Sequence, residues 1–122
     1  MIIRPGSTIA NPELYRVTLP DVPINFEVPK VISTSRLIGG GSSVSIYKSS
    51  LAGEQRSFRV TVPVEKYRTI KRISDSSIDE WLLMAQGRIF KCVISILSAI
   101  PDRRRRDLIT VVVEITIISE ES

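Results

Sequence analysis

The chain has 122 residues, 43% of them hydrophobic, which is enough for one domain with a buried core. It contains no histidine and one cysteine, so it lacks the usual neutral-pH acid/base, the commonest metal ligand and any internal disulfide. A net charge of +4 favours acidic partners without identifying nucleic acid. We therefore expect a single domain over residues 1–122 that is not an enzyme, with no catalytic, metal or cofactor site. We also expect no membrane span, because no run of about 18 uncharged apolar residues occurs.

The first 30 residues carry five of the seven prolines, at Pro5, Pro12, Pro20, Pro23 and Pro29. Each proline removes a backbone donor and disfavours helix at the preceding residue. This pattern predicts an extended N-terminal arm over residues 1–30, followed by a β core over residues 31–119. Two interpretations of the arm stay open, because its short apolar pieces could pack on their own domain or lie against another subunit.

Two strand-like runs follow the arm, Val31–Ile38 and Ser43–Ser49, separated by Gly39-Gly40-Gly41-Ser42. Glycines supply the positive φ of a tight connection, so the runs predict a hairpin. A phosphate-binding loop is disfavoured, because no Lys-Ser/Thr follows the glycines and the next segment has the pattern of a strand.

The segment Ser57–Val64 alternates apolar and polar residues and predicts a half-buried strand. Its Pro63 indicates an edge position, a bulge or the end of the strand. The structure of residues 65–73 is left open. Tyr67, Ile70 and Ile73 recur every three residues, but Thr69 and the flanking charges fit a twisted strand or a loop equally well.

One helix is predicted at about residues 76–86. Ser77 and Glu80 have the spacing of a capping box, and Gly87 stands where a helix C-cap is expected. Four apolar residues have the spacing of a helix stripe, namely Ile78, Trp81, Leu82 and Ala85. On this stripe Trp81 is expected to anchor the helix to the sheet, and not to serve as a ligand platform.

A long C-terminal β-hairpin is predicted at about residues 88–119. Its strands are Arg88–Ser98 and Asp107–Ser119, both rich in β-branched residues with a period of two. Cys92 lies within the first strand and is expected to be a buried thiol. With the preceding elements, this pattern predicts a mainly β domain, an antiparallel β-sandwich or barrel with one short packed helix.

The hairpin connection contains four consecutive arginines, Arg103, Arg104, Arg105 and Arg106, between Asp102 and Asp107. Four adjacent charges cannot all turn inward, so an exposed loop is expected. These arginines are the candidate partner-contact residues. The contact could be an acidic protein surface or a phosphate backbone, or the loop could face only solvent.

This order of elements resembles the small β-sandwich or barrel proteins of bacteriophage tails, the tail-tube and distal-tail relatives. The likeness covers about residues 31–119 and rests on four segments, S-F-R-V-T-V-P-V, S-S-I-D-E-W-L-L-M-A-Q, G-R-I-F-K-C-V-I-S and D-L-I-T-V-V-V-E-I-T-I-I. Tail-tube proteins also carry a long tube-forming hairpin, to which we assign no segment of this sequence.

The resemblance implies a structural subunit of the tail tube, the distal tail or the baseplate, which acts through ring-forming contacts between copies. Its implied partners are further copies and other tail or baseplate proteins, and its implied location is the virion tail, assembled in the host cytoplasm. The alternative is a small basic nucleic-acid-binding β-barrel module, with Arg103–Arg106, Arg88 and Lys91 as its phosphate contacts. No aromatic stacking platform beside these basic residues is evident in the sequence.

Overall fold

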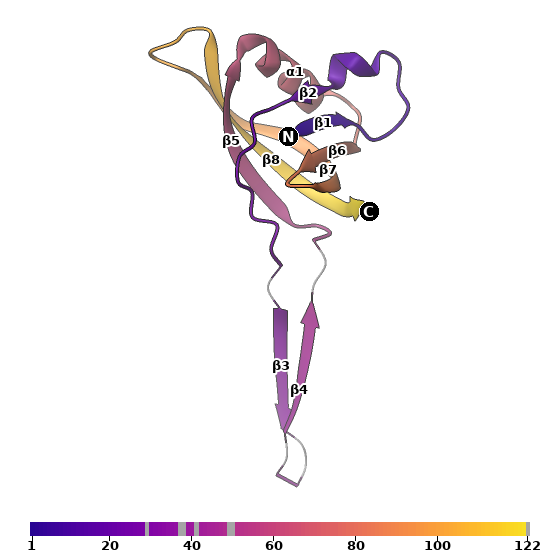
Figure 1. Ribbon diagram of the computed structural model, residues 1–122. Helices are drawn as coiled ribbons and strands as arrows, with labels where there is room; N and C mark the ends of the chain where they lie inside the picture. Colours follow the sequence, from indigo (N-terminus) through magenta and orange to yellow (C-terminus); the bar gives the residue numbers. More distant parts are fainter. Residues whose placement is uncertain (29, 37–38, 41, 49–50, 122) are drawn as a thin grey trace.

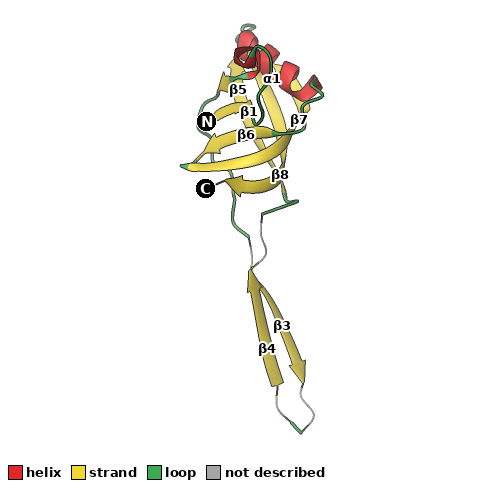
Figure 2. Cartoon of the chain, turned by 90° about the vertical axis from the view of Figure 1, so that its right-hand side faces the viewer, coloured by secondary structure: helices red, strands yellow, loops and turns green. Residues whose placement is uncertain are grey.

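The computed structural model describes residues 1–28, 30–36, 39–40, 42–48 and 51–121. The chain is mainly β, with one α-helix, and its main feature is a six-stranded antiparallel sheet in the order β2-β1-β6-β7-β8-β5 that curls into a half-barrel (Figures 1 and 2). The elements in chain order are β1 (Ile2–Pro5), the 3-10 helix η1 (Pro12–Tyr15), β2 (Val17–Thr18), β3 (Lys30–Arg36), β4 (Ser42–Lys48), β5 (Gln55–Pro63), α1 (Val64–Asp75), β6 (Trp81–Ala85), β7 (Arg88–Pro101) and β8 (Leu108–Glu121).

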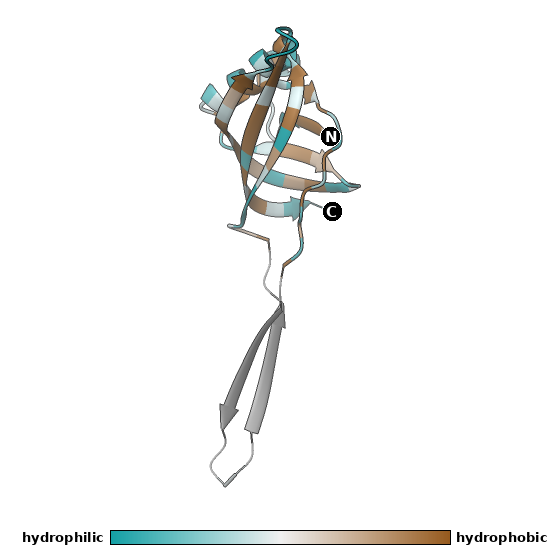
Figure 3. Cartoon of the chain, turned by 90° about the vertical axis from the view of Figure 1, so that its left-hand side faces the viewer, coloured by the Kyte–Doolittle hydropathy of each residue, from teal (hydrophilic) through white to brown (hydrophobic). Residues whose placement is uncertain are grey.

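The predicted C-terminal hairpin is confirmed by β7 and β8, each 14 residues long. They pair antiparallel from Ile89 opposite Glu121 to Pro101 opposite Ile109. Their inward positions supply a large share of the core, with Phe90, Cys92, Ile94, Val111, Val113, Ile115 and Ile117 buried. Figure 3 shows the resulting alternation of hydrophobic and hydrophilic residues along the strands.

The helix predicted at residues 76–86 is wrong, because Trp81–Ala85 forms strand β6. Trp81, Leu83 and Ala85 are buried and the residues between them are half-buried, which is the period of two of a strand. Before the strand, Ser76 Oγ accepts a hydrogen bond from Ile78 N at 3.0 Å. Two of the residues read as helix caps have other roles. Glu80 lies 3.8 Å from Lys91 Nζ, and Gly87 belongs to the two-residue turn Gln86-Gly87 between β6 and β7. Both turn residues have positive φ, 54° and 72°, as a type I′ hairpin turn requires.

The helix of this fold is α1, in the segment whose structure the sequence leaves open. Ile70 and Ile73 are fully buried on its inner face, and Tyr67 packs partly against the core. Pro63 ends β5 immediately before the helix, and β5 lies at the edge of the sheet, so two of the three positions expected for this proline, the strand end and the edge, are confirmed. α1 covers the end of the half-barrel that lies away from the β3–β4 hairpin (Figure 1).

The N-terminal segment belongs to the core, which corrects the predicted separation of an arm from a β core that begins at residue 31. β1 lies between β2 and β6 in the sheet, and Ile3 is fully buried. The described prolines are compatible with this position, because Pro5 and Pro12 stand at the ends of short elements and Pro20 and Pro23 lie outside them. Most of the apolar surface of the segment, apart from Leu14, is therefore covered by its own domain, and Trp81, at 1% exposure, lies in the same core.

Residues 19–28, which we call the strap, cross the open side of the half-barrel. Leu19, Ile24 and Phe26 are buried, and Phe26 stacks on Phe90 with ring centroids 4.2 Å apart. Side chains hold the strap on both sides. Gln86 Nε2 donates to Ile24 O at 2.9 Å, and Arg56 donates to Asn25 O at 2.7 Å and to Glu27 O at 3.1 Å. The half-barrel is thus closed by a segment that is not itself a strand.

The predicted glycine-linked hairpin is confirmed by β3 and β4, which pair from Lys30 opposite Lys48 to Arg36 opposite Ser42. Gly39 and Gly40 have φ of 103° and 96°, as expected for a tight connection. The predicted strand ends at 37–38 and 49, and Gly41, lie outside the described residues. β3 and β4 form a two-stranded sheet of their own, which projects from the end of the half-barrel opposite α1 (Figures 1 and 2).

Candidate interaction surfaces

The four arginines predicted to contact a partner lie on the exposed loop between β7 and β8. Asp102 orders this loop, because one of its carboxylate oxygens accepts hydrogen bonds from Arg104 N at 2.8 Å and from Arg105 N at 3.2 Å. The Arg105 guanidinium pairs with Asp107 at 3.2 Å. Within the described residues the other three guanidinium groups form no ion pair, so they are available to a partner.

Helix α1 brings further basic residues to the same end of the molecule. Val64 N donates to Asp107 O at 3.1 Å, which joins the start of α1 to the arginine loop. Residues 64–75 and 102–107, which we call the basic pole, contain eight basic residues and four acidic ones. This excess of four equals the net charge of the whole chain. The basic pole is therefore a region of concentrated positive charge, and residues 30–48, with three basic residues and no acidic one, are a second.

Arg88 and Lys91 are not brought to this region, which corrects the phosphate-binding set proposed from the sequence. They lie at the opposite end of β7, where carboxylates already engage them. Arg88 Nε donates to Glu120 at 2.9 Å, and this hydrogen bond raises the pKa of Arg88 and lowers the pKa of Glu120. Lys91 Nζ lies 3.8 Å from Glu80 and 3.9 Å from Glu121. The two basic side chains thus form ion pairs at the end of the β7–β8 hairpin that lies away from the arginine loop.

A surface that sequence reasoning missed comes from two irregularities in the β7–β8 pairing. The partner of Lys91 is Ser119 and that of Cys92 is Ile117, so Ile118 is an extra residue in β8. Ile96 and Ser98 pair with successive residues of β8, so Leu97 is the extra residue in β7. Both bulge residues are exposed, by 40% and 55%. Together with Val93 and Ile100 they leave apolar side chains on the outside of the sheet.

The β3–β4 hairpin is a third surface. Within the described residues its strands pair only with each other, so both outer edges of this ribbon are open. Its sequence, residues 30–48, contains Lys30, Arg36 and Lys48 and no acidic residue. An isolated two-stranded ribbon is marginally stable in water, and open strand edges are templates for pairing with another chain. Sequence reasoning found this hairpin but had no signal that it would stand apart from the sheet.

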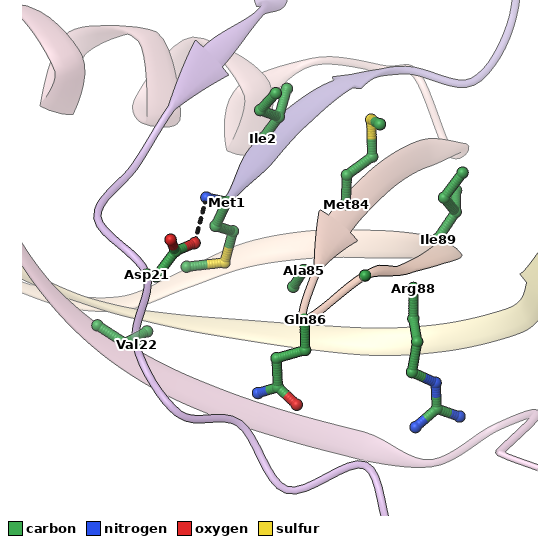
Figure 4. A pocket seen from close by; sticks show the side chains of 10 residues that line it. Met1, Ile2, Asp21, Val22, Met84, Ala85, Gln86, Arg88 and Ile89 are labelled. Atoms are coloured by element: carbon green, nitrogen blue, oxygen red, sulfur yellow. Dashed lines mark hydrogen bonds and ion pairs between the residues drawn. The ribbon is translucent and has the colours of Figure 1, made fainter.

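A depression of about 540 Å³ lies between the strap and the turn from β6 to β7 (Figure 4). Met1, Val22 and Met84 contribute apolar surface to it. The polar groups around it already have partners within the chain. Asp21 accepts from the amino group of Met1 at 2.7 Å, Gln86 holds the strap, and Arg88 is paired with Glu120. It therefore offers little specific chemistry to a small molecule.

Cys92 is buried in the sheet, as predicted, and burial raises its pKa to about 12. A thiol of this kind stays protonated at neutral pH and is a poor nucleophile. In the described part of the chain, Cys, Asp and Glu side chains nowhere gather into a set of three that could hold a metal ion. None of the described helices is long and apolar enough to cross a membrane. Comparison with family models, with curated proteins and with solved structures finds no match.

Proposed function

We propose that this chain is a non-enzymatic structural subunit of a bacteriophage tail, in the tail tube, the distal tail or the baseplate, and that it acts by forming a ring of identical copies. The observation that carries the proposal is the β3–β4 hairpin, which projects from the body of the protein and, among the residues that the structure describes, has no partner at either edge. We use "body" for all residues outside 29–50. A ribbon of this kind gains stability when another chain supplies the missing partner.

The fold is consistent with this role in two further ways. The curled β sheet with one packed helix has the elements expected of tail-tube and distal-tail relatives, and the β3–β4 hairpin is a candidate for the tube-forming hairpin that the sequence did not reveal. The body contains no buried polar or charged side chain among the described residues, so its core serves packing and not chemistry.

The test is to replace residues 29–50 with a short Gly-Ser linker and to compare the variant with the parent by size-exclusion chromatography with light scattering. Lys30 and Lys48 are paired at the base of the hairpin, so a short linker can span the gap. We expect the parent to form particles of defined copy number, visible as rings by electron microscopy, and the variant to be a folded monomer. A parent that stays monomeric at high concentration would contradict the proposal, as would a variant that still forms the same particles.

A second candidate function, a nucleic-acid-binding module, is favoured by one observation, the concentration of positive charge in the basic pole. The matched variants are Arg103, Arg104 and Arg106→Ser and a control that replaces three exposed arginines elsewhere, Arg4, Arg16 and Arg59→Ser. Fluorescence anisotropy with a short DNA duplex measures affinity at several salt concentrations. Loss of binding and a reduced salt slope in the first variant alone would support this function. Equal effects of the two variants, or no binding by the parent, would rule against it.

A further inference from the structure

Strand β5 leaves one edge of the main sheet open. It stands last in the strand order and pairs only with β8, from Gln55 opposite Thr116 to Pro63 opposite Leu108. Phe58, Val60 and Val62 are buried on its inner face, while Ser57, Arg59 and Thr61 are exposed. Along its other edge, no backbone hydrogen bond to any described residue is present. The strand is therefore well anchored and still has main-chain groups to offer.

The strap does not form main-chain hydrogen bonds with this edge of β5. It approaches β5 near the beginning of the strand, where the Arg56 side chain holds Asn25 O and Glu27 O. These are bonds from a side chain to the strap, so the strap gives β5 no main-chain partner. Residues 57–63 remain as a template of seven residues that ends at Pro63, which has no N–H to donate.

The β3–β4 hairpin fits this template in length. Each of its strands has seven residues, as many as the open part of β5. Its three basic residues are accompanied by no acidic residue, whereas the body outside the basic pole contains nine acidic residues and six basic ones. Pairing of two hairpins, or of a hairpin with the basic pole, would bring like charges together. The body outside the pole is acidic as a whole, but residues 57–63 themselves contain Arg59 and no acidic residue, so the choice of β5 rests on strand length and free main-chain groups.

Geometry requires that the hairpin and the β5 edge come from different copies. The hairpin projects away from the end of the half-barrel and does not fold back along its own β5 (Figures 1 and 2). At the other edge of the sheet, β2 has only two residues, too few to hold a strand of seven. A contact between two different surfaces of identical chains is heterologous, and such contacts form a ring when the rotation between neighbours closes.

We infer that the β3–β4 hairpin of one copy adds to the open edge of β5, residues 57–63, in a second copy, and so extends the six-stranded sheet of that neighbour. This inference rests on the proposed assembly and names the surface that receives the hairpin. The main-chain pairing supplies the affinity, and the length of β5 favours this edge over the edge formed by the two-residue strand β2.

The first test uses hydrogen exchange of the parent protein and of the variant whose hairpin is replaced by a linker. In assembled parent, amides within residues 57–62 should exchange several-fold more slowly than in the variant, because alternate N–H groups of β5 gain partners. Amides of β8, which are already paired with β5, should change little and serve as the internal control. Assembly that protects another edge or surface, and not β5, would overturn the inference while leaving the proposed function intact.

A second test uses cross-linking between two labelled copies in a Cys92→Ala background. One copy carries Ser45→Cys in the hairpin, and the other carries Thr61→Cys on β5 or, as a control, the exposed Thr8→Cys. A short bis-maleimide should join the hairpin to β5 several-fold more than to the control position. Equal yields at the two positions in assembled protein would contradict the inference. If the parent protein does not assemble at all, the proposed function itself, on which this inference rests, is wrong.

Discussion

The body and the β3–β4 hairpin differ in how much of their stability comes from contacts within the chain. In the body, six strands, a helix and the strap surround one continuous core in which Ile3, Leu83, Phe90 and Val113 are completely buried. The hairpin has two strands and within the described residues pairs with nothing else. The body can thus be stable alone, whereas the hairpin needs a partner to gain comparable order. Four predictions test this difference.

The largest effect is expected from deletion of residues 1–28. This change removes β1 and β2 from the sheet and the strap from the core, including the buried Ile3, Leu19 and Phe26. We expect the remainder to lose cooperative unfolding, measured by circular dichroism during urea titration. A cooperative transition in the truncated chain would show that the N-terminal segment is an accessory to the core and not a part of it.

The next largest effect is expected from Trp81→Ala. The indole is 1% exposed, lies 6.0 Å from the Tyr15 ring, and donates from Nε1 to Ile78 O at 3.0 Å. Its removal leaves a cavity and should lower the free energy of unfolding by about 3–5 kcal/mol, measured by urea denaturation. Leu14→Ala is the control, because Leu14 is 50% exposed. A loss below about 1 kcal/mol would show that the site collapses around the missing ring.

A smaller effect, seen only at high pH, is expected from Cys92. Burial raises the pKa of the folded thiol to about 12, above the ordinary value of 9.0 that applies in the unfolded chain. As pH rises from 9 toward 12, the unfolded state loses this proton first, so the thiol's contribution to stability is full below 9 and is lost across that window. The urea midpoint of the parent should therefore fall more steeply there than that of Cys92→Ala. Parallel curves would show that the thiol is accessible to solvent.

The smallest effect on stability is expected from replacing residues 29–50 with a linker. Although this change removes almost as much chain as the N-terminal deletion, it touches no strand of the main sheet. The free energy of unfolding of the monomer should stay within about 0.5 kcal/mol of the parent value at concentrations too low for assembly. A larger loss in urea denaturation would show that the hairpin supports the body directly.

The C-terminal hairpin could be predicted, apart from its bulges and the exact ends of its strands, because its signal is local. β-Branched residues with a period of two over 14 positions have one good solution, a long strand with one face in the core. The glycine-linked hairpin, the strand that ends at Pro63, the buried Cys92 and the exposed arginine loop were predictable for the same reason. Each depends on a backbone preference or a charge that acts within a few residues.

The helix at residues 64–75, a segment left open, and the strand at 81–85, predicted as helix, show where local signals end. W-L-L-M-A is too short for periodicity to separate the two states, and its capping residues also suit an irregular turn. The segment forms a strand because β1 and β7 lie on either side of it and form hydrogen bonds with its backbone. The Gln86-Gly87 turn was the available signal for a hairpin, since it requires positive φ at two successive residues.

The sequence by itself determined that this chain is mainly β, that it ends in a long hairpin, and that its arginines are exposed. Only the tertiary structure decided that the proline-rich start lies in the core, that α1 joins the arginine loop to make one basic pole, and that the β3–β4 hairpin stands apart with open edges. The physical reason is the distance along the sequence over which each kind of interaction acts. Strand propensity and charge are properties of neighbours in sequence, whereas burial and free sheet edges depend on which distant segments find each other.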